Sequence, residues 1–291
     1  MKSENTVINK NKKIRKLSMS ILRISTSVLI GLIIGCIALY IFQDKLIFMP
    51  QGITEETINY TNRINENVEE INYKAKDGTN LHGWFVNNID IEKPKLLIYF
   101  GGNAEEISYM TDKVQRYEDW SVALMNYRGY GLSEGKPSEK NFYSDALEIY
   151  DYFLNRQNVK YSKIVVIGRS IGTGVATYLA DKRDVNGVIL ISPFDSLVSV
   201  GKEQFPMFPI SLIARHKFNS IERAPKIAEP LGIIIASEDQ IIPPRHSRKL
   251  AKKWGGTVNI KEIDGEGHNS VSGREEYWKF IGEFLRSITI E

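Results

Sequence analysis

The chain has 291 residues, with 38 Lys and Arg against 35 Asp and Glu, and a formal net charge of +3 at pH 7. The length is sufficient for one large buried core, and the basic excess is confined to the first 23 residues, which excludes a basic nucleic-acid-binding face in the rest of the chain. The single cysteine, Cys36, excludes an intrachain disulfide and any cysteine-based metal site.

The N-terminal region is typical of a membrane anchor. Residues 1–23 form a basic leader, and residues 24–43 carry no charge. A helix of 20 residues is about 30 Å long, which matches the hydrocarbon core of a bilayer. No small-x-small cleavage motif follows this stretch, which favours an uncleaved anchor over a signal peptide. Because basic residues near a span stay in the cytoplasm, we expect a cytoplasmic N-terminus and a catalytic domain on the opposite side.

Residues 44–68 are predicted to connect this anchor to a globular domain over 69–291. The connector contains a second apolar patch, 46–50, which ends at a proline and is expected to lie at the membrane interface or on the domain. Gly31 and Gly35 have the spacing of glycines in paired membrane helices, but glycine is common in such helices. The sequence therefore leaves the oligomeric state open.

Strands and helices alternate through the domain. Asp77-Gly78 is a strong turn signal and predicts a hairpin over 69–86. Further strands are predicted over 95–100, 122–126, 164–167, 187–191, 231–236 and 258–263, and helices over 105–117, 139–156, 247–254 and 274–286. This alternation predicts an α/β fold with a mostly parallel sheet, helices on both faces and an antiparallel hairpin at the start. The apolar segment 193–230 is too long for an ordinary connection and is expected to form a small lid.

The sequence Gly168-Arg169-Ser170-Ile171-Gly172 joins a β-branched run to an apolar helical pattern. A strand, a sharp turn and a helix in this order form the nucleophile elbow, in which a strained serine projects its hydroxyl from the sheet edge. The glycines at 168 and 172 are expected to remove Cβ atoms that would collide. In the alternative interpretation, they only allow close helix packing or bind a phosphate.

Four histidines are candidates for the base that a serine hydroxyl needs at neutral pH: His82, His216, His246 and His268. Only His268 lies in a glycine-rich loop, 264–269, that emerges after the last predicted strand at the carboxyl edge of the sheet. The other three are interpreted as surface or structural histidines. His268 is therefore the predicted general base.

The base needs a carboxylate that orients it, and Asp239 follows the predicted strand 231–236. The order Ser170, Asp239, His268 is the order of triads that are built on such an elbow. Glu238 is adjacent to Asp239 but is expected to point elsewhere. Asp195, just after the preceding strand, remains an alternative acid.

An oxyanion formed on attack needs backbone N–H donors. Ile171 follows the serine and supplies the first by position, and Asn103, in the loop after the strand over 95–100, is the predicted second donor. In the alternative interpretation, Gly101-Gly102 is only a tight turn.

Several motifs occur together in one order: Phe100-Gly101-Gly102-Asn103-Ala104, Asn126-Tyr127-Arg128-Gly129-Tyr130-Gly131-Leu132-Ser133, Gly168-Arg169-Ser170-Ile171-Gly172, Ser192-Pro193-Phe194, Asp239-Gln240-Ile241-Ile242-Pro243 and Gly267-His268-Asn269. From about residue 40 to the C-terminus, the chain resembles the membrane-anchored α/β-hydrolases of the YfhR type, which are related to eukaryotic α/β-hydrolase-domain lipid hydrolases. The resemblance implies an α/β-hydrolase fold and serine hydrolase activity with Ser170, Asp239 and His268 as the triad. The family usually has histidine where Gly101 stands, which predicts a looser oxyanion loop here.

The expected reaction is hydrolysis of a carboxylic ester or thioester through an acyl-serine intermediate, without a cofactor or metal. The anchor and the apolar lid favour a small-molecule or lipid acyl substrate, such as a lysophospholipid. Two alternatives remain open. One is a serine peptidase of the same fold, and the other is a non-catalytic scaffold tethered to the membrane.

Overall fold

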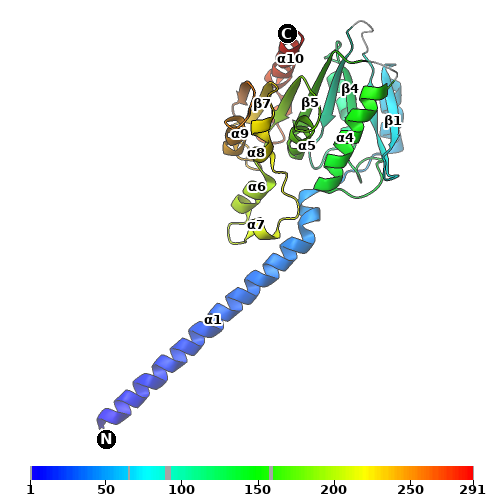
Figure 1. Cartoon of the computed structure of the whole chain (residues 1–291). Helices are drawn as coiled ribbons and strands as arrows, with labels where there is room; N and C mark the ends of the chain where they lie inside the picture. The colour runs from blue at the N-terminus through cyan, green and yellow to red at the C-terminus, as the bar shows by residue number, and fades with distance from the viewer. Residues whose placement is uncertain (1, 65, 89–92, 157–159, 291) are drawn as a thin grey trace.

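The computed structural model describes residues 2–64, 66–88, 93–156 and 160–290. A long helix, α1 (Lys2–Ile47), projects from a globular body that contains the sheet (Figure 1). The part of α1 from Arg15 to Ile47 is long and apolar enough to cross a membrane. A short amphipathic helix, α2 (Glu55–Ile64), follows α1 and packs against the first strand.

Within the described residues, eight strands form one sheet in the order β1-β2-β4-β3-β5-β6-β7-β8. The strands are β1 (Val68–Lys74), β2 (Asn80–Val86), β3 (Lys95–Phe100), β4 (Ser121–Met125), β5 (Lys163–Arg169), β6 (Gly187–Ile191), β7 (Leu231–Ala236) and β8 (Val258–Ile263). Strand β2 pairs antiparallel with both β1 and β4, and every pair from β4 to β8 is parallel. The predicted mostly parallel sheet with an initial antiparallel hairpin is confirmed. The carboxyl ends of its parallel strands meet at one edge, where ligands bind in such sheets.

Helices cover both faces of the sheet (Figure 1). The longer ones are α4 (Glu139–Asn155), α5 (Ile171–Ala180), α9 (Pro244–Ala251) and α10 (Glu275–Ile290). Strand β5 shows how the core divides, because successive side chains of a strand point to opposite faces. Val166 packs in the layer formed by α4, α5 and α9, whereas Val165 packs in the layer formed by α10.

Three helices differ from their predicted bounds by more than one residue, and one of them, α10, ends at Ile290 rather than at residue 286. The region predicted as a helix over 105–117 is a 3₁₀ turn, Ile107–Tyr109, and a short helix, α3 (Met110–Val114). The reason is that Glu106 is extended and its carboxylate accepts a hydrogen bond from the backbone N–H of Ser108 at 3.2 Å. Helix α9 begins at Pro244, three residues before its predicted start, because proline suits the first turn of a helix.

The segment between β6 and β7 contains α6 (Leu197–Gln204), α7 (Ile210–Ile213), α8 (Ser220–Arg223) and a 3₁₀ turn. The hydroxyl of Ser196 caps α6 by accepting a hydrogen bond from the backbone N–H of Ser199 at 3.0 Å. Helices α6 and α7 pack together and project from the sheet, and α7 lies beside α1 (Figure 1).

The residues that follow α1 are part of the domain's packing. Phe48 is only 2% exposed, and its ring lies edge-on against Phe142 of α4, with the centroids 5.2 Å apart. The sequence assigned Phe48 to an apolar patch at the membrane interface or on the domain, and the structure places it on the domain. Because it packs beside α4, the C-terminal end of α1 is fixed to the body.

Candidate active site

Ser170 stands between β5 and α5 with φ 52° and ψ −119°, a region that a residue with a Cβ rarely occupies. Such a conformation costs about 1–3 kcal/mol and persists only where the surroundings enforce it. A Cβ on Gly168 would overlap the carbonyl of Gly172, and a Cβ on Gly172 would overlap the carbonyl of Phe100. Both glycines are therefore required by close backbone approach, as the sequence predicted.

A chain of hydrogen bonds links three side chains from three loops at the carboxyl edge of the sheet. The Nε2 atom of His268 lies 2.9 Å from the hydroxyl of Ser170, and its Nδ1 atom lies 2.6 Å from Oδ2 of Asp239. The carboxylate favours a hydrogen on Nδ1, which leaves Nε2 free to accept from the hydroxyl. The other oxygen of Asp239 accepts the backbone N–H groups of Ile241 and Ile242 at 2.9 and 2.8 Å, which fixes the carboxylate.

The alternative acid, Asp195, belongs to a different cluster. One of its oxygens lies 2.7 Å from Nδ1 of His246, and the other accepts Nζ of Lys249 at 2.5 Å. Burial alone would raise the pKa of the Asp195 carboxyl, but the hydrogen bonds from these two partners outweigh it and lower the pKa. His82 pairs with Glu70, and His216 pairs with Asp44. These three histidines each have a structural partner away from Ser170.

The predicted oxyanion donors, Ile171 and Asn103, line the same cavity as Ser170 and His268. No acceptor is found for the backbone N–H of either residue in the part of the chain that the structure describes. Asn103 comes close to Ser170 because its loop follows β3, whose last carbonyl touches the start of α5 at Gly172. The two N–H groups are therefore available to a bound ligand.

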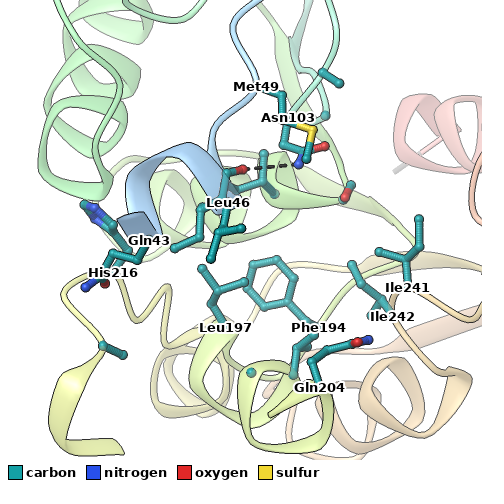
Figure 2. A pocket seen from close by; sticks show the side chains of 18 of the residues that line it. Gln43, Leu46, Met49, Asn103, Phe194, Leu197, Gln204, His216, Ile241 and Ile242 are labelled. Atoms are coloured by element: carbon teal, nitrogen blue, oxygen red, sulfur yellow. Dashed lines mark hydrogen bonds between the residues drawn. The ribbon is translucent and has the colours of Figure 1, made fainter. Parts of the chain in front are cut away.

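The loop that carries Asn103 is held by several hydrogen bonds. The carbonyl of Asn103 accepts the Tyr130 hydroxyl at 2.6 Å and the backbone N–H of Met49 at 3.1 Å. Its side-chain amide donates to the carbonyl of Ile47 at 3.1 Å, which is the dashed line in Figure 2. The Tyr127 hydroxyl also donates to the carbonyl of Gly101 at 3.0 Å. Hydroxyls of the chain and the end of α1 therefore hold this loop, and its looseness relative to a loop that carries histidine stays a prediction.

A buried ion pair that the sequence analysis missed contacts both the loop after β3 and the loop that carries His268. The Glu105 carboxylate accepts the backbone N–H of Gly102 at 2.6 Å and pairs with Arg169 at 3.0 Å. Burial would lower the pKa of the Arg169 guanidinium, but the charge of Glu105 outweighs it and raises the pKa, so Arg169 stays charged. The Tyr99 hydroxyl donates to Glu105 at 2.8 Å. The pKa of the Tyr99 phenol is raised, mainly by burial and secondly by the negative charge of this carboxylate.

Arg169 extends this network to the histidine loop. Its Nη2 atom lies 3.4 Å from Oδ1 of Asn269 and 3.5 Å from the carbonyl of His268. Glu105 and Arg169 together therefore connect the loop of Gly102 and Asn103 to the loop that carries His268. A signal was present in the sequence, since a charged residue stands next to the serine, but sequence alone does not identify its partner.

A cavity of about 490 Å³ leads away from Ser170 and His268. Its walls are mostly apolar and come from three parts of the chain (Figure 2). The contributing residues include Leu39, Leu46 and Met49 around the end of α1, Leu197, Phe205 and Ile213 of the 193–230 segment, and Ile241 and Ile242 after β7. The contribution of α1 was not predicted. Among the described residues, no group of three or more His, Cys, Asp or Glu could hold a metal ion.

A parallel sheet with a strained serine elbow, and an aspartate and a histidine on later loops, defines the α/β-hydrolase class of folds. A sequence profile described as "alpha/beta hydrolase fold" matches residues 95–226. The chain is 30% identical over 263 residues to an uncharacterised membrane protein of Saccharomyces cerevisiae, and the alignment covers 87% of this chain and 92% of that protein. It is 26% identical over 287 residues to the α/β-hydrolase domain-containing protein WAV2 of Arabidopsis thaliana, with 90% and 93% coverage.

The similarity extends to bacterial proteins and to solved structures. Identity with the uncharacterised protein YfhR of Salmonella typhi is 30% over 227 residues, which covers 71% of this chain and 76% of YfhR. An esterase of Pyrococcus furiosus superposes with a TM-score of 0.67 at 19% identity, over 84% of this chain and 97% of the esterase. The chain belongs to the α/β-hydrolase superfamily, and the resemblance found in the sequence is confirmed. This membership supports assignment as a hydrolase.

We predict that Glu105→Gln lowers kcat on ester substrates on the order of tenfold or more, with a smaller change in KM, because Arg169 loses its partner and the two loops lose their common support. Steady-state kinetics measures the split. Glu134→Gln, an exposed carboxylate, is the matched control. An unchanged kcat in the folded Glu105 variant would contradict the positioning role.

A second prediction concerns the cluster around His246, whose Nε2 atom lies 3.1 Å from Glu203 on α6. Burial lowers the pKa of this imidazole, but the bonds to Asp195 and Glu203 outweigh it, so the pKa rises above 6.5. A raised pKa means that the charged pair stabilises α6 fully below about pH 6.5 and that this stabilisation is lost as the pH rises through the folded-state pKa.

We therefore expect amide exchange in α6, corrected for intrinsic rates, to accelerate as the pH rises above about 6.5 and the imidazole loses its proton, while α4 stays protected. His246→Gln is expected to remove the pH dependence. If α6 responds to pH equally in the wild type and in this variant, the cluster does not tie α6 to the domain.

Proposed function

We propose that the protein is a serine hydrolase that cleaves a carboxylic ester or thioester through an acyl intermediate on Ser170. The single observation that carries this proposal is the hydrogen-bonded chain from Asp239 through His268 to Ser170, at the end of an apolar cavity. Each group has the partner that its role requires. The strained backbone at Ser170 is a further sign of function, because such strain concentrates at active sites.

In this proposal, His268 takes the proton of the Ser170 hydroxyl as the oxygen attacks the acyl carbon. The negative charge that develops on the carbonyl oxygen is stabilised by the N–H groups of Ile171 and Asn103. His268 then gives its proton to the leaving alcohol or thiol. A water molecule, activated by the same imidazole, releases the acid from Ser170. Asp239 keeps the ring oriented and stabilises its charged form, and no cofactor takes part.

The apolar walls of the cavity favour an acyl chain over a peptide as the bound group, because peptide N–H and C=O groups need hydrogen-bonding partners. This supports an esterase or thioesterase rather than a peptidase of the same fold. The hydrogen-bonded chain supports an enzyme rather than a non-catalytic scaffold.

The anchor belongs to the same proposal. We infer that residues 24–43 cross the membrane, that 44–68 connect this span to a domain over 69–291, and that 193–230 act as a lid. The apolar helix and the description of the yeast relative as a membrane protein support the anchor. The basic leader supports a cytoplasmic N-terminus with the domain on the opposite side.

We predict that Ser170→Ala abolishes labelling by a fluorophosphonate probe and hydrolysis of p-nitrophenyl esters, whereas Ser211→Ala, at an exposed serine of α7, changes neither. Asp239→Asn is expected to lower kcat on the order of a thousandfold or more, because the imidazole loses its orienting carboxylate. Asp264→Asn, at an exposed carboxylate, is the control.

Folded wild-type protein that the probe fails to label would favour the scaffold, and a higher kcat/KM on aminoacyl amides than on esters would favour the peptidase.

The orientation has a separate test. A C-terminal alkaline phosphatase fusion in a bacterial host is expected to be active, and a cytoplasmic reporter at the same position is expected to be inactive, because alkaline phosphatase folds only after export. The reverse pattern would show that the domain faces the cytoplasm.

A further inference from the structure

The 193–230 segment contacts α1 inside the stretch predicted to cross the membrane. Most of the partly or fully buried positions of this stretch of α1 recur every three or four residues and so lie on one helix face: Leu32, Gly35, Cys36, Leu39 and Gln43. Ala38 is also partly buried and lies to one side of this face. Most other side chains of this stretch are exposed and apolar, which suits a helix surrounded by lipid. One face of this helix therefore contacts the domain, and the other faces are mostly exposed.

The depth of this contact follows from Gly35. A Cβ on Gly35 would lie 2.5 Å from Cε1 of Phe208, so the ring of Phe208 rests on the glycine backbone. Gly35 precedes Gln43, at the end of the uncharged stretch, by eight residues, about 12 Å along a helix. One half of a bilayer's hydrocarbon core is about 15 Å thick. Phe208 therefore reaches the depth of the lipid acyl chains.

The composition of the contacting segment agrees with that depth. Residues 205–214, the lid tip, contain no charged side chain. Met207 and Leu212 are 74% and 84% exposed in the isolated chain, and Phe205 is also exposed. Soluble proteins rarely present such side chains together to water, and a contiguous patch of this kind marks an interaction surface.

Polar groups begin where the uncharged stretch ends. The amide of Gln43, only 8% exposed, donates to the carbonyl of Ile213 at 3.2 Å and accepts the backbone N–H of Arg215 at 2.7 Å. The carboxylate of Asp44 pairs with Arg215 at 2.7 Å and with His216 at 2.8 Å. This belt ties the lid tip to α1 and marks the level at which the chain leaves the hydrocarbon.

The cavity that ends at Ser170 begins at this level. Leu39 lies four residues inside the uncharged stretch, and Leu46 lies just beyond it, while Phe205 and Ile213 of the lid tip face the same space. Figure 2 shows Leu46 across the cavity from Leu197 and Phe194. The space between α1 and the lid is thus mostly apolar between Leu39 and the serine, and Gln43, Gln204 and His216 are polar side chains that also line it.

We propose that the lid tip is immersed in the leaflet next to the domain, and that the acyl chain of a glycerolipid of that leaflet enters between α1 and the lid to reach Ser170. The chemistry rests on the proposed function. Water adds across the acyl C–O bond, so that the fatty acid and the alcohol of the lipid are released. The substrate does not have to leave the membrane, because the anchor itself forms one wall of its path.

The depth is tested without any activity measurement. The full chain with Cys36→Ala is given one cysteine by Met207→Cys, labelled with bimane and reconstituted in phosphatidylcholine and phosphatidylglycerol vesicles. We expect quenching by lipids with a nitroxide on the acyl chain and little quenching by aqueous iodide. The control, Lys253→Cys, lies beyond α9 at the opposite edge of the sheet and is expected to show the reverse. Iodide quenching at position 207 equal to that at 253 would overturn the immersion.

The route is tested with the double variant Met207→Lys/Leu212→Lys, at two exposed positions that do not line the cavity. Hydrolysis of soluble p-nitrophenyl butyrate is expected to stay within about twofold of wild type, while hydrolysis of a fluorogenic phospholipid in vesicles falls about tenfold or more, because lysine is disfavoured at this depth. Ile260→Lys, at an exposed apolar position on the edge strand β8, is the matched control.

The outcomes separate this inference from the proposed function. An unchanged rate on the vesicle-borne phospholipid, or equal loss on both substrates, would overturn the lateral route. Turnover of a palmitoyl-thioester peptide in the same vesicles, without turnover of the phospholipid, would overturn the glycerolipid assignment. Wild-type protein inactive on p-nitrophenyl butyrate would instead count against the proposed function, whereas the quenching result would still report the depth of the lid tip.

Discussion

The close approach of helix α5 to strand β3 is the constraint on which the rest of the site depends. Gly172 touches the carbonyls of Phe100 and Gly101, and Gly168 touches Gly172. No side chain fits at either contact, so the chain must turn sharply between β5 and α5, and Ser170 takes up the strain. The same contact brings the loop after β3 beside the serine, and Asn103 of this loop lines the same cavity as Ser170. One packing constraint thus positions both the proposed nucleophile and the proposed oxyanion donor.

The end of the anchor is built into the site. Asn103 bonds to the carbonyl of Ile47 and to the N–H of Met49, and Phe48 between them is buried against α4. On the other side of the same loop, Glu105 holds Gly102. The loop is therefore fixed between a buried ion pair and the helix that we propose crosses the membrane. A movement of the domain relative to α1 would strain these bonds, so the site is fixed relative to the C-terminal end of this helix.

Two aspartate–histidine pairs occupy the carboxyl edge of the sheet, and they differ in what lies beyond the imidazole. Beyond His268 is the hydroxyl of Ser170, whereas beyond His246 is the carboxylate of Glu203. The first arrangement leaves a basic nitrogen facing a nucleophile. The second holds a charged imidazole between two acids and ties α6 to the domain. Similar residues thus serve the proposed reaction in one place and hold the 193–230 segment in the other.

The sequence by itself determined the alternation of strands and helices, the elbow, the uncharged N-terminal stretch and the residues of the hydrogen-bonded chain, because these depend on local pattern and on order along the chain. Only the tertiary structure decided that Asp195 pairs with His246, that Glu105 bonds Arg169, and that Leu39 lines the cavity. These contacts join residues 51, 64 and more than 100 positions apart, and their geometry is set by how the sheet and helices pack. Periodicity and spacing carry no information about partners so far apart along the chain. The packing of the sheet and helices brings these residues together and so determines which of them are in contact.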